Sequence, residues 1–170
     1  MSSGYQVKII GLEELLRSFA RFPQISEKHN RTAMQKAVIT VESNVKPLTP
    51  VGVSGRLRNS IASEVRGGGS KIVGAIGSTL RSEEYPAVME FGRRPGAAMP
   101  PYGPGSQLAR WVHLVLGDAV SVFQVARGIA RKGIRGKFYL KNGFEKSRSA
   151  IMGYFQAGLR AMVEDLRRGR

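Results

Sequence analysis

The chain contains no cysteine, which excludes disulfide bridges, thiolate metal sites and cysteine nucleophiles. Its only histidines are His29 and His113, and neither has a second histidine or a carboxylate at metal-ligand spacing. The Walker phosphate-binding motif and the Gly-x-Ser-x-Gly nucleophile motif are also missing. The sequence therefore predicts no catalytic residues, no metal and no cofactor.

Long hydrophobic runs are absent too. No stretch approaches the length that crosses a bilayer, and the N-terminus lacks the apolar segment of a signal peptide. We therefore expect a soluble protein, made in the cytoplasm, with no membrane partner.

Acidic residues are scarce: 12 Asp and Glu stand against 27 Lys and Arg, for a formal net charge of +15. The excess is uneven, at +5 in residues 1–85 and +10 in residues 86–170. Such a charge indicates an anionic partner, with nucleic acid as the first candidate and acidic protein subunits as the alternative.

The first half of the chain favours an α+β domain. Residues 5–10 are typical of a short strand. Leu12, Leu15, Leu16 and Phe19 recur at helical spacing, and we expect Pro23 to end that helix. A second helix is predicted from about residue 26 to 46, before Pro47 and Pro50.

A β-hairpin is predicted next, with strands at 61–66 and 71–78 around a Gly-rich turn. Its tip is expected to be mobile and long enough to reach a neighbouring molecule. Residues 93–106 are rich in proline and glycine and indicate an irregular arm. The rest is predicted to be helical, at 108–116, 120–132 and 142–168, and to pack on the sheet. The whole chain is expected to form one domain.

The stretch Tyr85–Gly92 is predicted to be the pivot of the chain. Pro86 restricts the backbone before it, and Gly92 can end a helical turn. Two interpretations stay open. Its apolar residues, Phe91 among them, could fill the core at a surface corner. Alternatively they contact another subunit, and Glu90 pairs with a basic residue of its own or a neighbouring chain.

The most basic segment follows at residues 127–148, where Glu145 is the only acidic residue. We expect its charges to contact DNA or an acidic partner. The aromatic residues Phe138 and Tyr139 within it either stack on bases or anchor the core. The predicted contact residues are Arg127, Arg131, Lys132, Arg135, Lys137 and Lys141.

Four segments, taken together in their order, resemble the neck and tail-completion proteins of long-tailed bacteriophages. They are the Ser-Gly-Arg-Leu-Arg-Asn-Ser-Ile pattern within 47–61, the Glu-Phe-Gly element of 85–92, and residues 100–112 and 126–140. Two positions depart from the family pattern: Pro86 replaces the more usual alanine, and Lys137 replaces a proline.

The resemblance implies a structural, non-enzymatic virion protein of the tail or neck. It implies a ring of about six copies around the DNA channel, which completes the tail or joins it to the head. The implied partners are the tail terminator or tail tube, the head-closure or connector proteins, and the genomic DNA in the channel. The interface residues it suggests are Gly55, Leu57, Arg58, Tyr85, Glu90, Phe91, Gly92, Pro100 and Tyr102. The alternative is a nucleic-acid-binding module without sequence preference that uses residues 127–148.

Overall fold

The computed structural model describes residues 12–52, 54–80 and 85–168, and it has the expected α+β architecture. The strand predicted at residues 5–10 lies outside the described residues. In chain order the elements are α1 (Leu12–Leu48), α2 (Arg56–Asn59), β1 (Ile61–Gly68), β2 (Lys71–Ser78), α3 (Tyr85–Phe91), β3 (Gly92–Arg93), α4 (Gln107–Trp111), the π-helical turn η1 (Val112–Leu116), α5 (Val122–Lys132), β4 (Ile134–Arg135) and α6 (Tyr139–Arg167).

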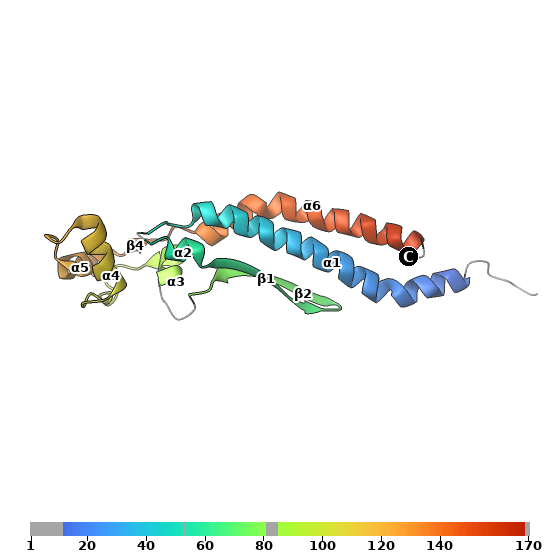
Figure 1. The fold of residues 1–170 in the computed structure, drawn as a ribbon, viewed down its shortest axis with the longest axis horizontal. Coiled ribbons are helices and arrows are strands. Elements are labelled where there is room, and N and C mark those ends of the chain that lie inside the picture. Colours follow the sequence, from blue (N-terminus) through green and yellow to red (C-terminus); the bar gives the residue numbers. More distant parts are fainter. Residues whose placement is uncertain (1–11, 53, 81–84, 169–170) are drawn as a thin grey trace, which may run out of the picture.

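The long helix α1 is the central layer of an elongated molecule (Figure 1). Helix α6 runs antiparallel along one side of α1, and the β1–β2 hairpin lies along another side. We call these three elements the shaft. The prediction that the C-terminal helix packs on the sheet was wrong, because α6 packs on α1.

A single helix spans the region where two were expected. Pro23 lies inside α1 rather than at its end. Proline lacks an N–H and leaves the carbonyl four residues earlier without its helical donor. Pro23 is exposed, so water can satisfy that carbonyl, and the helix continues.

Helices α1 and α6 approach closely because small residues line their contact. A Cβ atom on Gly143 would lie 2.4 Å from Val45 Cγ2. Polar pairs extend this contact along the shaft: Asn44 Nδ2 donates to Ser147 Oγ at 2.9 Å, and the hydroxyls of Thr40 and Tyr154 lie 3.0 Å apart. The sequence pattern of large apolar residues did not reveal this face.

The hairpin has the predicted strands and alternation. Ile61 pairs with Ser78 and Val65 with Gly74 in an antiparallel register, and this face turns toward α1. A Cβ on Gly74 would lie 2.5 Å from Val38 Cγ1, so β2 can approach the helix only without a side chain there. The tip does not reach outward as expected. It lies against α1, where Arg31 Nη2 donates to the Gly67 carbonyl at 2.5 Å.

The core is small and lies at one end of the shaft, where the end of α1 meets α2, β1 and the start of α6. Its buried side chains are Val41, Val45, Leu57, Ile61 and Tyr139. Beyond this core, residues 94–133 form a separate end of the molecule that contains α4, η1 and α5 (Figure 1). We call residues 94–133 the distal lobe.

Candidate functional site

The pivot predicted at Tyr85–Gly92 is a structural corner that starts helix α6. The carboxylate of Glu90 is 4% exposed and accepts hydrogen bonds from the Leu140 N–H at 2.9 Å and the Lys141 N–H at 3.2 Å. These are unsatisfied donors of the first helical turn, and a negative charge there also complements the helix dipole. Glu90 therefore pairs with backbone N–H groups of its own chain, and not with the basic side chain that was expected.

The residue before this helix explains why Glu90 is needed. Phe138 occupies the N-cap position with φ of 51°, and its side chain has no oxygen that could cap the helix. Glu90 supplies the acceptor from α3 instead. The Lys137 and Phe138 N–H groups also donate to the carbonyls of Met89 and Glu90, at 2.9 and 3.1 Å.

Glycine is required where the two chain segments of this corner cross. Gly92 has φ of +83°, and a Cβ there would lie 2.5 Å from the Ile134 carbonyl oxygen. A Cβ on Gly136 would lie 2.6 Å from the Glu90 carbonyl oxygen. Strands β3 and β4 pair at this point, Gly92 opposite Arg135, and so hold the two connections to the distal lobe together.

Tyr139 fills the space beneath the corner. It is fully buried, and its hydroxyl donates to the Pro86 carbonyl at 3.3 Å. Burial raises the pKa of Tyr139 to about 12, and the charges of Glu90 and Tyr85 contribute to the same shift. The hydroxyl group is therefore a neutral structural donor.

The predicted interface residues divide into two groups. Gly55 and Gly92, with φ of 61° and 83°, and the buried Leu57 and Glu90 serve the fold of their own subunit. Arg58, Tyr85, Phe91 and Tyr102 are exposed, and Pro100 is half-buried. Phe91 is 74% exposed, so the interpretation that placed it in the core was wrong.

The predicted basic contact residues are all exposed, but they lie on two parts of the molecule. Arg127, Arg131 and Lys132 belong to α5 in the distal lobe. The others, Arg135, Lys137 and Lys141, follow the corner into the start of α6. The two aromatic residues also differ. Tyr139 is a core anchor, whereas Phe138 is exposed, with Lys141 Nζ 5.9 Å from its ring centroid.

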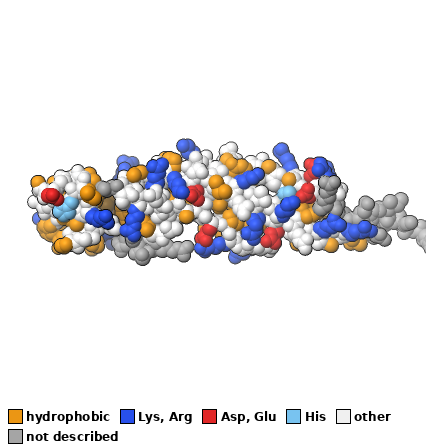
Figure 2. All heavy atoms as spheres, in the orientation of Figure 1, with side chains coloured by type: hydrophobic (Ala, Val, Ile, Leu, Met, Phe, Trp, Pro, Cys, Tyr) orange, Lys and Arg blue, Asp and Glu red, His pale blue; other side chains and the backbone are white. Residues whose placement is uncertain are grey.

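Exposed apolar residues on the distal lobe are the feature that the sequence interpretation missed. The fully buried side chains of the lobe are small, namely Ala109, Val112 and Ala126. Leu114 and Val115 are 63% and 52% exposed, and Figure 2 shows hydrophobic side chains gathered at this end of the molecule beside Lys and Arg. The signal was present in the run Trp111–Leu116, which is apolar around most of a helical turn. The exposed large apolar side chains of the lobe are Met99, Tyr102, Trp111, Leu114, Val115, Leu116 and Phe123.

Titratable groups form pairs rather than a reactive cluster. His29 Nε2 lies 2.9 Å from Asp165 Oδ2, and His113 Nδ1 lies 2.8 Å from Asp118 Oδ1. Within the described ranges no group of three His, Asp or Glu residues could hold a metal ion.

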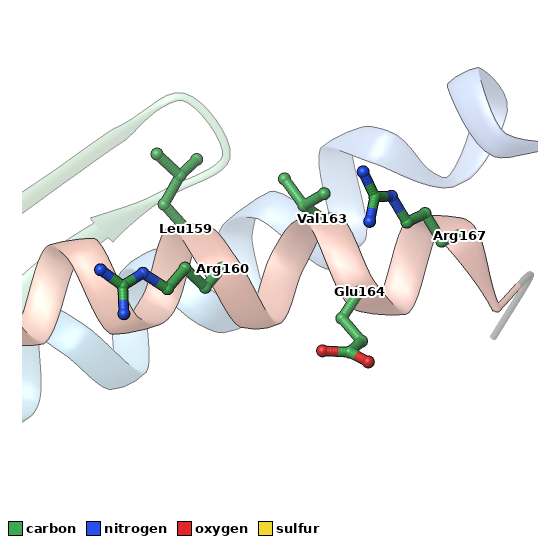
Figure 3. A pocket seen from close by; sticks show the side chains of 5 residues that line it. All are labelled: Leu159, Arg160, Val163, Glu164 and Arg167. Atoms are coloured by element: carbon green, nitrogen blue, oxygen red, sulfur yellow. The ribbon is translucent and has the colours of Figure 1, made fainter.

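A shallow hollow on the outside of α6 is lined by that helix alone (Figure 3). Leu159 and Val163 point to one side, and Glu164 accepts a hydrogen bond from Arg168 at 2.7 Å. The hollow therefore lacks an unpaired acid–base group of the kind that catalysis uses. Of the helices described, none is long and apolar enough to cross a membrane.

Comparison with known proteins finds a family that the first part of the chain resembles. Residues 13–92, from the start of α1 to the Glu-Phe-Gly corner, match the family model described as "Bacteriophage HK97-gp10, putative tail-component". No curated protein and no solved structure matches the chain. The distal lobe and α6 lie outside the matched residues. The family is structural, in agreement with the prediction of a non-enzymatic protein. Residues 13–92 of the chain are therefore similar to the HK97 gp10-like family of phage tail components.

Proposed function

We propose that this chain is a structural subunit of the phage neck that completes the tail, joins the tail to the head, or does both. In this proposal about six copies form a ring around the DNA channel. The ring contacts the tail terminator or tail tube on one side and head-closure or connector proteins on the other. The observation that carries the proposal is the match of residues 13–92 to a family of tail components.

The shape of the subunit supports an assembled state. The molecule is elongated, with a small core at one place and exposed apolar side chains on both the shaft and the distal lobe. Leu16, Phe19, Met152 and Leu159 on the shaft are each more than half exposed. Exposed apolar surface of this extent is typical of proteins that contact other subunits.

Electron microscopy of the purified protein, alone and with tails assembled without it, tests the proposal. We expect rings of about six copies, either free or at the end of the tail. Particles from a phage that lacks the chain should have tails that do not join heads. Intact, infectious virions without the chain would overturn the proposal.

Binding of nucleic acid without sequence preference is the second candidate function. It is favoured by the exposure of Arg131, Lys132 and Arg135. Alanine at these three positions should then abolish DNA binding by the isolated protein while heads and tails still join. A joining protein would instead bind free DNA weakly, with a steep dependence on salt concentration.

A further inference from the structure

The distal lobe combines exposed apolar side chains with an almost unopposed positive charge. Residues 94–133 contain five exposed Lys and Arg residues and one acidic residue, Asp118. The Asp118 carboxylate already lies beside His113. The described part of the chain shows no ion pair for Arg127 or Arg131. The basic residues of the lobe are Arg94, Arg110, Arg127, Arg131 and Lys132.

The two kinds of side chain lie next to one another on α5. Phe123, Arg127 and Arg131 follow at intervals of four residues, so they share one face of the helix. The Phe123 ring meets Tyr102 edge-on, with the ring centroids 5.5 Å apart. An aromatic pair and two guanidinium groups therefore form one continuous strip of surface.

We infer that the distal lobe docks on an acidic protein surface that has an apolar centre. This inference rests on the proposed function, because it names the chemistry of one of the partners proposed there. Apolar residues at the middle of a contact provide most of the binding energy, while charges around them set orientation and association rate. Arginine and aromatic residues are also the types enriched at such contacts.

The positive charge of the distal lobe argues against a second copy of the lobe as its binding partner. Two lobes placed face to face would bring two clusters of Lys and Arg together, with only one carboxylate on each side. A surface rich in Asp and Glu removes this repulsion and pairs with the guanidinium groups.

The apolar residues decide against nucleic acid. Tyr102, Trp111 and Phe123 could stack on bases. The other exposed apolar side chains of the lobe, Met99, Leu114, Val115 and Leu116, are aliphatic or thioether groups that cannot stack in this way. Phosphate groups would also leave these side chains in water. A protein surface can bury them while it pairs with the basic residues.

Binding of lobe variants to purified tails assembled without this chain tests the inference. One variant carries Arg127→Glu and Arg131→Glu, and a second carries Leu114→Ser and Val115→Ser. Because all four side chains are exposed, the variants should keep the wild-type circular dichroism and thermal midpoint. We expect each pair to weaken tail binding at least about tenfold, the effect of losing one central contact.

Matched pairs on the shaft serve as controls. Lys36→Glu with Arg160→Glu reverses the same amount of charge on exposed positions of α1 and α6. Ile39→Ser with Val73→Ser removes the same number of exposed apolar side chains from the shaft. The inference requires a clearly smaller loss for the controls. Equal binding by wild type and lobe variants, or an equal loss in lobe and shaft variants, would overturn it.

Zero-length carbodiimide cross-linking of the same complexes identifies the surface directly. This reagent joins a lysine amine to a carboxylate, and we expect Lys132 to be joined to Asp or Glu of a tail protein. Links from Lys132 to another copy of this chain, or ultraviolet cross-links from the lobe to DNA, would overturn the inference. Failure of the wild-type protein to bind tails at all would instead contradict the proposed function.

Discussion

The carboxylate of Glu90 accepts a hydrogen bond from the Leu140 N–H at 2.9 Å, across 50 positions of sequence. Through this contact a short helix, α3, caps the 29-residue helix α6. The Glu-Phe-Gly element of the tail-component match therefore has a clear structural role. Glu90 caps a helix, Gly92 permits the crossing of two chain segments, and Phe91 points out of the subunit.

Substitution Glu90→Gln should lower the free energy of unfolding by about 1–3 kcal/mol. It keeps the shape of the side chain but removes the charge at the start of α6 and leaves an amide donor facing backbone N–H groups. Chemical denaturation measures the change. Glu145→Gln, an exposed position of the same helix, is the control and should change stability by less than about 0.5 kcal/mol. Equal effects at both positions would contradict the capping role.

Gly143→Ala should destabilise the α1–α6 contact by about 1–3 kcal/mol. The added methyl group would lie 2.4 Å from Val45 Cγ2 and 2.9 Å from Val45 Cα, so the helices would have to separate. Gly153→Ala is the matched control, because a Cβ there meets no atom within 4 Å. Alanine is the better helix former, so the control should be neutral or stabilising by up to about 1 kcal/mol. Thermal or urea unfolding of both variants checks the difference in sign.

Phe91→Ala should cost less than about 1 kcal/mol of stability, because the ring is 74% exposed and leaves no large cavity. If Phe91 contacts another subunit, the same variant should assemble poorly although it remains folded. Leu57→Ala, in the buried cluster, should cost about 2–5 kcal/mol. Thermal unfolding and particle assembly separate the two effects. A loss of stability at Phe91 as large as that at Leu57 would show that the ring is not exposed.

The free energy of unfolding should fall at alkaline pH, because Tyr139 ionises more readily in the unfolded chain than in the folded chain. Its pKa is raised from 10 to about 12 in the folded chain, so the unfolded chain ionises first. The contribution of Tyr139 to the free energy of unfolding is complete below pH 10 and is lost as the pH rises toward 12. Absorbance of tyrosinate should show one of the five tyrosines titrating near pH 12. Tyr139→Phe should remove both that step and its share of the alkaline destabilisation.

Several features of this protein follow from its sequence alone. Alternation along residues 61–66 determined a strand with one face inward, and the adjacent Gly-rich turn determined a hairpin. The lack of cysteine and the charge of +15 were likewise plain in the composition. These properties are local or additive, so they can be read without knowing which elements meet.

Only the tertiary structure decided which of these elements pack together. Glu90 looked like half of an ion pair because its donors, the N–H groups of Leu140 and Lys141, are 50 and 51 positions away. In the sequence Gly143 looked like an ordinary helical glycine, and only the tertiary structure places Val45 opposite it. Pro23 predicted a helix end, but it lies at an exposed position inside α1, where water can replace the missing donor. Burial, capping and close approach depend on contacts between distant segments, and periodicity carries no information about those contacts.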